Sequence, residues 1–179
     1  MPQRPRLRAL LLALAIVLPS AAADELDDVA KLRLDGQPGV ALERADRFIA
    51  EHPRDAQMRF LRAVILSDLG RAADATQALE ALTQDFPDLP EPYNNLAVLY
   101  AARGEYDKAE HALDEALRLR PTYPTAQENL GDVYAALAAR AYATALRLEA
   151  DRPGLASKLA AVRAALAPSV ASSSASAPH

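Results

Sequence analysis

The histidines and the carboxylates are the side chains with which this sequence could do acid–base or metal chemistry. The three histidines, His52, His111 and His179, are far apart in the chain, and no two have the spacing of metal ligands. The chain has no cysteine, no glycine-rich phosphate loop and no nucleophile elbow. The residue types and their spacing therefore predict no metal site and no nucleophilic enzyme, and we expect no cofactor.

The acids are the remaining candidates for catalysis. In the segment 107–120, acids and bases alternate at helical spacing: Asp107, Glu110, Asp114 and Glu115 with Lys108, Arg118 and Arg120. Opposite charges three or four residues apart pair on the wet face of a helix. We interpret this segment as a solvated helix face and predict that the chain is not an enzyme. A carboxylate pair for general acid–base catalysis is the alternative that stays open.

The elements that must position these side chains repeat along the sequence. Glycine, alanine and proline each recur three times at a spacing of 34 residues, with a constant phase. The positions are Gly36, Gly70 and Gly104; Ala41, Ala75 and Ala109; and Pro53, Pro87 and Pro121. Glycine accepts the left-handed conformation of a helix C-cap, and proline cannot continue a helix. Each period therefore predicts a helix, a short turn, a second helix and a stop, with alanine where two helices cross closely.

The first helix of each period carries a second set of repeated residues. These are Ala63, Ala97 and Gly131, and Leu66, Tyr100 and Tyr134. The segment from Tyr93 to Tyr100 is similar to the tetratricopeptide signature, aromatic-x-x-Leu-small-x-x-Tyr, and later signature positions hold Ala109, Leu113, Ala116 and Pro121. The chain thus resembles the tetratricopeptide repeat family, closely over 90–123, less over 56–89 and least over 24–55.

This resemblance implies an all-α fold, a right-handed α-solenoid of antiparallel helix pairs. The repeats would cover 24–55, 56–89 and 90–123, followed by a partial repeat at 124–157. Tyr93, Tyr100 and Tyr134 would be core residues. One departure is that Arg59 and Arg62 stand where the family has an aromatic residue and a leucine. An alternative apolar stripe is formed by Met58, Leu61, Ile65 and Leu69. We therefore expect that helix to be rotated slightly about its axis.

The last repeat departs further from the family pattern. Ala138 stands near the expected glycine, and neither glycine nor proline occurs between Tyr134 and Glu149. We predict one continuous helix from about Thr125 to Glu149. After the turn at Pro153-Gly154, four apolar residues at helical spacing predict a final amphipathic helix: Leu155, Leu159, Val162 and Leu166. We expect this helix, which ends by residue 167, to cap the last apolar face of the solenoid.

The two ends of the chain differ from the repeats. Three arginines precede ten uncharged apolar residues, Ala9 to Leu18, and small residues follow at Ala21 to Ala23. Residues 1–23 are predicted to be a cleavable signal peptide, because a spanning helix needs ~20 apolar residues; an uncleaved anchor is the alternative. Because of this signal peptide we expect a periplasmic or otherwise exported protein. No cysteine is present to which a lipid could be attached. Residues 168–179, mostly Ser, Ala and Pro, are predicted to be a disordered tail.

Charge and the family resemblance together predict the kind of partner. Without residues 1–23 the chain has 17 basic and 24 acidic residues, a net charge of −7, which disfavours nucleic acid and anionic lipid. The resemblance implies that the partner binds on the concave face of the first helices. The corresponding residues are Phe60, Val64, Ser67, Asn94, Asn95, Val98, Glu128, Asn129 and Asp132. Asn95 and Asn129 are also structural residues in many members of the family.

The predicted function is an exported scaffold or adaptor that binds another protein, with contacts centred on 90–123 and the following unit. The acids on the concave face favour a neutral or basic partner segment. The Lys and Arg residues of the family's carboxylate clamp are absent, which argues against binding of an acidic C-terminus. Two alternatives remain: an accessory chaperone for another envelope protein, as in cytochrome maturation or outer-membrane biogenesis, and an enzyme subunit whose active site lies on another chain.

Overall fold

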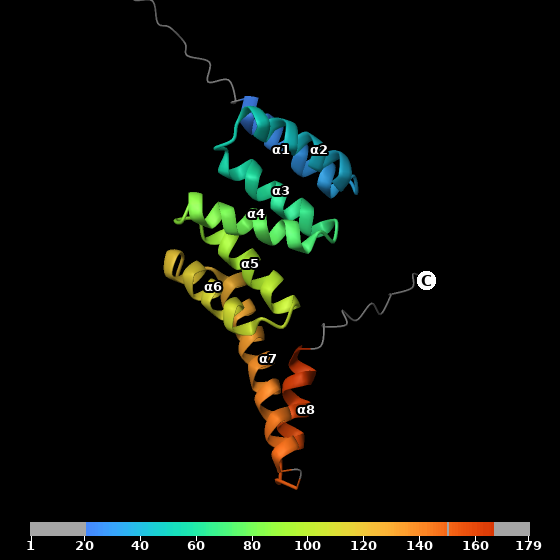
Figure 1. The fold of residues 1–179 in the computed structure, drawn as a ribbon, viewed down its shortest axis with the longest axis vertical. Helices are drawn as coiled ribbons and strands as arrows, with labels where there is room; N and C mark the ends of the chain where they lie inside the picture. Colours follow the sequence, from blue (N-terminus) through green and yellow to red (C-terminus); the bar gives the residue numbers. More distant parts are fainter. Residues whose placement is uncertain (1–20, 150, 167–179) are drawn as a thin grey trace, which may run out of the picture.

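The computed structural model describes residues 21–149 and 151–166, in which every regular element is an α-helix. The helices are α1 (Ala21–Leu34), α2 (Pro38–Glu51), α3 (Ala56–Asp68), α4 (Ala72–Asp85), α5 (Pro90–Ala102), α6 (Tyr106–Leu119), α7 (Pro124–Leu148) and α8 (Leu155–Leu166). They stack in chain order as antiparallel pairs (Figure 1). This arrangement is the predicted α-solenoid. The predicted signal peptide, apart from its last three residues, and the predicted tail lie outside the described residues.

The repeated glycines end the first helix of each pair, as predicted. Gly36, Gly70 and Gly104 have φ angles of +76°, +72° and +74°, in the left-handed region. The N–H of the residue after each glycine donates to the carbonyl oxygen five residues earlier, at 2.9–3.0 Å. This bond is the mark of a Schellman C-cap, and it requires a residue that tolerates positive φ. Each second helix ends two residues before the repeated proline, at Glu51, Asp85 and Leu119.

The core runs through the stack at the repeated small residues. Ala41, Ala75 and Ala109 are each 0% exposed, which confirms that these positions need a small side chain. Larger apolar side chains such as Leu79 and Leu113 fill the space between the helix pairs. Burying a side chain of that size contributes ~1.5–3 kcal/mol, so packing between neighbouring repeats supplies most of the stability.

The helix α3 keeps the same orientation as α5 about its axis, so the expected rotation does not occur. Met58 and Ile65 are buried, and so are the equivalent residues of α5, Pro92 and Leu99. Ala63 is also fully buried, as is Ala97 at the same position of the next repeat. The repeat phase therefore determines which face of α3 is covered.

Two aspartates explain how the unusual arginines fit into this phase. The Arg59 Nη2 atom lies 2.7 Å from Asp85 Oδ2 of α4, and Arg62 Nε lies 2.5 Å from Asp46 Oδ1 of α2. Both arginines are half-buried by their aliphatic stems while the guanidinium groups reach these carboxylates. An arginine can thus replace an apolar residue here, because a neighbouring second helix supplies its counter-charge.

The first helices of the repeats, α1, α3, α5 and α7, form the inner side of the stack. α1 contacts α3 and α5 contacts α7, whereas within the described residues no contact of that extent joins α2 to α4 or α4 to α6. At these two places the first helices approach each other more closely than the second helices do, so the first helices lie on the inner side of the curve. We call their solvent-facing surface the concave face, and the surface of α2, α4 and α6 the convex face.

The helix α7 is continuous through Ala138, which confirms the prediction for the last repeat. It spans Pro124–Leu148, and α8 packs against its second half, away from the helix pairs (Figure 1). α8 therefore covers the projecting part of α7. Because α8 does not lie over the helix pairs, the expectation that it caps the last apolar face of the repeats was wrong.

The end of the last repeat is uncovered at Tyr134, which is 49% exposed. The prediction that Tyr134 is a core residue was therefore wrong. At the equivalent position, the Tyr100 ring is covered by Arg103 and Lys108, at 5.1 and 5.4 Å from its centroid. Lys108 belongs to the returning helix α6. In the last repeat no helix returns, because α7 continues straight on, and Tyr134 is left without that cover.

Candidate functional site

Two rows of side chains at repeat-equivalent positions run along the concave face. The first row is Leu26, Phe60, Asn94 and Glu128, and the second is Ala30, Val64, Val98 and Asp132. Both rows begin with apolar residues in α1 and α3 and end with exposed carboxylates in α7. The concave face therefore changes from apolar to acidic along the solenoid.

A cavity of about 640 Å³ opens on the apolar end of this face. It is bounded by α1, α3 and the start of α5. Its apolar lining comes from Leu26, Ala30, Phe60, Leu61, Leu89 and Pro92. A cavity of this size accepts several side chains of a bound segment, and its apolar lining favours aliphatic or aromatic ones. We refer to it as the concave cavity.

The rim of the concave cavity is negatively charged. Asp27, Asp88 and Glu91 lie on it together with Arg120. Arg120 Nη2 is 2.5 Å from Glu91 Oε1, so these two charges offset each other. Asp27 and Asp88 form no ion pair with any other described residue. The rim thus favours a ligand with positive charge beside its apolar groups.

The three predicted asparagines form hydrogen bonds within the protein, and two of them join helices. Asn129 Nδ2 donates to Asn94 Oδ1 at 2.8 Å, which links α7 to α5, and Asn94 is only 5% exposed. Asn95 Nδ2 donates to the carbonyl oxygen of Glu91 at 2.9 Å within α5. The expectation that Asn94 faces an open groove is corrected by its burial. Asn95 and Asn129 are half-buried, and the side-chain amide of each is the donor in these hydrogen bonds.

The other predicted residues are divided between the two ends of the concave face. Phe60 lines the cavity, whereas Glu128 and Asp132 are exposed at the acidic end. Val64 is half-buried and Val98 is 49% exposed. The predicted centre, residues 90–123 and the unit after it, does not coincide with the cavity. The cavity lies at the other end because α1 and α3 contribute the larger apolar residues.

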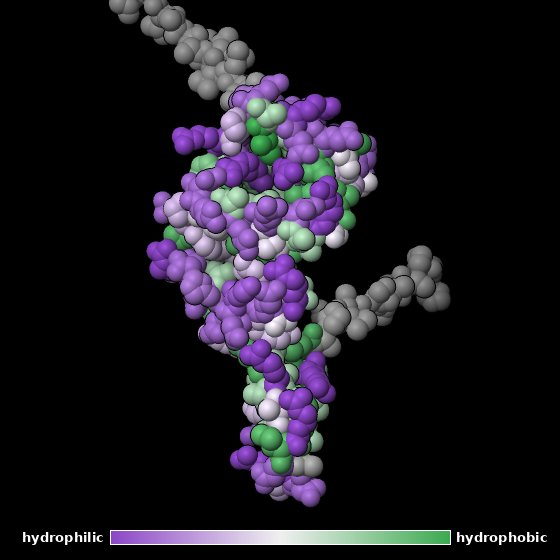
Figure 2. All heavy atoms as spheres, viewed as in Figure 1, coloured by the Kyte–Doolittle hydropathy of each residue, from purple (hydrophilic) through white to green (hydrophobic). Residues whose placement is uncertain are grey.

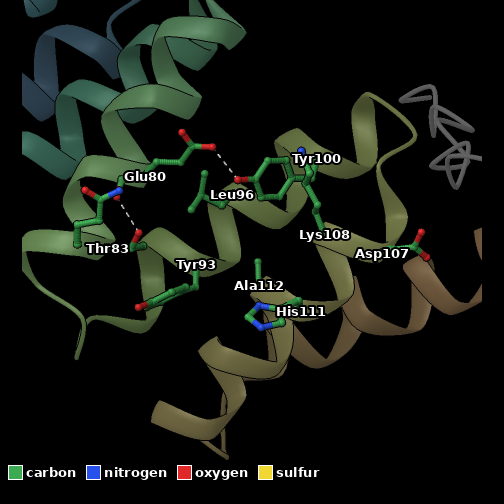
Figure 3. Close-up of a pocket in the computed structure, with 10 residues that line it drawn as sticks. Glu80, Thr83, Tyr93, Leu96, Tyr100, Asp107, Lys108, His111 and Ala112 are labelled. Atoms are coloured by element: carbon green, nitrogen blue, oxygen red, sulfur yellow. Dashed lines mark hydrogen bonds between the residues drawn. The ribbon is translucent and has the colours of Figure 1, made fainter.

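Two more pockets lie on the convex face, and the sequence analysis missed both. One of about 520 Å³ lies between α4 and α6, over Tyr93 and Leu96 of α5 (Figure 3). The other, of about 570 Å³, lies between α2 and α4, over Arg59 and Arg62 of α3. Their floors are repeat-equivalent, 34 residues apart. That spacing is the signal in the sequence from which the pair of pockets could have been found.

Polar groups of the convex pockets already have partners in the protein. Tyr100 Oη donates to Glu80 Oε1 at 2.8 Å (Figure 3), and burial, with the neighbouring carboxylate, raises the pKa of Tyr100 to about 12. The phenol is therefore neutral at physiological pH. In the other pocket, Arg71 Nη2 lies 2.6 Å from Asp74 Oδ2. These internal pairs make the concave face, with its unpaired rim acids, the better candidate site.

The described residues contain neither a cluster of metal-binding side chains nor a membrane-spanning helix. No group of three His, Asp or Glu side chains within 21–149 and 151–166 is arranged to hold a metal ion. No helix in the same part of the chain has the length and apolar character needed to cross a membrane. What the concave face offers is an apolar cavity, an acidic rim and an acidic far end.

Comparison with known proteins agrees with this architecture. Two protein-family models, both described as tetratricopeptide repeat, match residues 35–90 and residues 90–123. Among solved structures, a thermophilic TPR protein of Thermus thermophilus has 25% sequence identity and a TM-score of 0.62, with 82% of this chain and 84% of that chain covered.

Two other solved structures contain peptide-binding repeats. One is YrrB, a TPR protein with an unusual peptide-binding site, at 24% identity and a TM-score of 0.55, covering 62% of this chain and 57% of that one. The other is the first TPR of Spaghetti (RPAP3) bound to the HSP90 peptide SRMEEVD, at 18% identity and a TM-score of 0.61, covering 65% and 93%. The period, the glycine caps and these matches lead to one conclusion: the chain belongs to the tetratricopeptide repeat family.

Proposed function

We propose that this protein is an exported scaffold or adaptor that holds a segment of another protein on its concave face. The observation that carries the proposal is the change along that face, from an apolar cavity to exposed carboxylates. Apolar side chains of the partner would enter the cavity, and neutral or basic side chains would face Glu128 and Asp132. The likeness to repeats that bind peptides supports a protein partner. The acidic character of the face argues against an acidic segment.

A photoreactive residue placed in the groove tests this proposal. We expect a replacement of Phe60 or Val98 to cross-link to a partner protein in living cells. Gln77 of the convex pocket provides a matched position, because it is exposed and lies on a second helix. Cross-linking from Gln77 but not from Phe60 would move the partner surface to the convex face.

Charge reversal at the acidic end measures the electrostatic part of binding. Glu128→Lys together with Asp132→Lys is expected to weaken binding, and added salt should weaken binding to the unaltered protein, because exposed charges are screened within ~8–10 Å. Both side chains are exposed, so helicity and the melting temperature should stay nearly unchanged. Glu43→Lys with Glu51→Lys on α2 is the control, since both acids are exposed and lie on the convex side.

An accessory chaperone is the second candidate, and the apolar concave cavity favours it. A chaperone would bind unfolded segments of many sequences transiently, whereas an adaptor would bind one folded or defined partner. Cross-linking from Phe60 distinguishes the two. A single product indicates an adaptor, and many products that disappear after the client folds indicate a chaperone.

A further inference from the structure

Among the described residues, the last repeat has no second helix over its first one. In the preceding repeat α6 returns over α5, so that Leu96 is 4% and Ala97 is 1% exposed. At the equivalent positions of α7, Leu130 is half-buried and Gly131 is exposed. Tyr134 follows on the same face, and α8 packs only against the later part of α7 (Figure 1). One face of α7 is therefore left open at the end of the helix stack.

α6 borders this open face and adds acids to it. We call the surface the end face, and it consists of Gln127, Leu130, Gly131 and Tyr134 of α7 with Glu110, Asp114 and Leu117 of α6. Burial raises the pKa of the Tyr134 hydroxyl, and so do the neighbouring carboxylates of Glu110 and Asp114. Neither carboxylate forms an ion pair with any other described residue. In Figure 2, hydrophobic side chains reach the surface of the narrow part formed by α7 and α8, among hydrophilic ones. The end face thus combines uncovered apolar surface with two unpaired acids.

Gly131 indicates that another helix crosses α7 at the end face. Glycine in the interior of a helix lowers the stability of that helix relative to alanine. Beyond the backbone of α7 itself and the two chain neighbours of Gly131, no described atom lies within 4 Å of the point where a Cβ of Gly131 would stand. Packing within the described chain therefore does not require so small a residue here. A helix that approaches closely from outside would require it, as α6 requires Ala97 on α5.

The preceding repeat shows which kind of helix fits such a face. α6 covers α5 with small side chains, and Ala109 and Ala112 are 0% and 5% exposed. α6 also places a cation on the aromatic ring, because Lys108 Nζ lies 5.4 Å from the ring centroid of Tyr100 (Figure 3). The electron-rich face of an aromatic ring attracts a cation in this position. A helix that covers Tyr134 in the same way needs small apolar residues with a lysine or arginine beside them.

We propose that the end face binds an amphipathic helix of another protein, in the place that α6 occupies on α5. The small apolar face of that helix would cover Leu130 and Gly131, with a lysine or arginine over the Tyr134 ring. The unpaired carboxylates of Glu110 and Asp114 favour a basic helix over a neutral or acidic one.

A second copy of this chain is a poorer partner for the end face. α8 is the one described helix without an acidic residue, and its side chains Leu155 and Leu159 are already buried against α7. The end face is also separate from the concave face, so this inference goes beyond the proposed function and does not depend on it.

A labelled synthetic peptide based on α6 is the probe for this surface. It spans residues 105–120 and carries Asp107→Lys and His111→Lys, because these two residues and Lys108 line the pocket between α4 and α6. The peptide then has five basic and four acidic residues, a net charge of +1. We expect the full protein, in the form recovered from cells, to raise the fluorescence anisotropy of the peptide, and added salt to weaken this binding. A peptide with glutamate at the same three positions should bind about tenfold more weakly or less.

Substitutions of Gly131 separate a docking surface from a structural role. Gly131→Leu should weaken peptide binding about tenfold or more, because leucine fills the crossing point. The melting temperature should not fall, since the space above Gly131 is open and leucine is the better helix former. Gly131→Ala is the matched variant, and binding should persist because α5 has alanine at this position.

Neutral variants of the acids test the charge of the end face. Glu110→Gln with Asp114→Asn should weaken peptide binding severalfold. Glu128→Gln with Asp132→Asn removes the same charge on the concave face and should leave peptide binding unchanged. No binding of the peptide, or equal binding by the Gly131→Leu variant and the unaltered protein, would overturn the inference.

A photoreactive phenylalanine analogue in place of Tyr134 identifies any other occupant. We expect it to cross-link to the bound peptide. A cross-link between two copies of the chain, or to residues 167–179 of the same copy, would assign the end face to the chain itself and overturn the inference. Cross-linking from Phe60 reports on the concave face alone, so failure at the end face and failure of the proposed function are distinguishable.

Discussion

Single residues at equivalent repeat positions have different environments in this protein, depending on which helices cover them. Ala97 is 1% exposed where α5 packs against its neighbours, whereas Gly131, at the same position of the last repeat, is exposed. Tyr100 and Tyr134 differ in the same way. The cost of a substitution at a repeat position should therefore be largest in the repeats that have a returning helix.

Ala97→Leu is expected to lower the free energy of unfolding by ~1–3 kcal/mol, because three extra carbon atoms must fit where no space is present. Ala102→Leu is the control, since Ala102 lies at the end of the same helix and is exposed. Urea denaturation of both variants measures the difference. Equal midpoints for the two variants would contradict the assignment of Ala97 to the helix crossing.

In addition to apolar packing, caps at the turns and ion pairs between helices stabilise the arrangement of the helices. The caps are built at Gly36, Gly70 and Gly104. The ion pairs include a fork between α1 and α2: Arg44 Nε lies 2.6 Å from Glu25 Oε1, and Arg44 Nη2 lies 2.6 Å from Asp28 Oδ2. A second bridge joins α1 to α3, between Arg33 and Asp68. These bridges supplement the packing of α1, whose one fully buried large side chain is Val29.

Glycine should destabilise the interior of helix α7, and alanine should destabilise the helix C-caps, where φ is positive. Ala138→Gly is expected to cost about 1 kcal/mol, because it places glycine inside the continuous helix α7. Gly104→Ala is expected to cost ~1–2 kcal/mol for the opposite reason, since Gly104 has a φ of +74°. Thermal or urea unfolding measures both. A stabilising effect of Ala138→Gly would indicate a turn at that position and contradict the continuous helix.

Acid should selectively weaken the contact between α1 and α2. The hydrogen bond from Arg44 lowers the pKa of Glu25 below its ordinary value of 4.5. A lowered carboxyl pKa contributes stability above the ordinary value, and this contribution is lost as the pH falls through the lowered one. Arg44→Gln should therefore destabilise the protein at pH 7, and should do so much less at a pH below the lowered value. Arg54→Gln, an exposed arginine, is the control. A pH-independent difference between wild type and Arg44→Gln would argue against this ion pair.

The whole molecule combines an acidic curved body, residues 24–134, with a projecting part of net positive charge, residues 135–166 (Figure 1). In our proposal the body binds its partner along the concave face. Export is part of the proposed function and depends on the expected signal peptide. The expected signal peptide ends inside the first turn of α1, at Ala23, so its removal would trim three residues from that helix.

We predict that the protein recovered from cells begins at or near Asp24. The physical reason is the short apolar run, which is about half of a membrane span, followed by small residues. N-terminal sequencing of the protein from the soluble envelope fraction measures this. Recovery of residues 1–23 in the membrane fraction would instead identify an uncleaved anchor.

The repeat period, the turns and the unbroken helix α7 could all be predicted from the sequence, because each depends on residues close together in the chain. Gly104 needs only its own backbone conformation to end a helix, and Ala138 needs only the lack of a nearby breaker to continue one. Ala109 could be assigned to a helix crossing because the same small residue recurs at every period.

The tertiary structure decided which of these residues are covered and where the concave face is deepest. Asn94 is buried because α7 approaches α5 and pairs with it through Asn129, while Tyr134 is exposed because no helix returns over it. Arg62 keeps a position expected to be apolar because Asp46, on another helix, lies 2.5 Å away. Burial and counter-charges come from residues distant in the chain, and a 34-residue pattern gives no measure of how closely they approach.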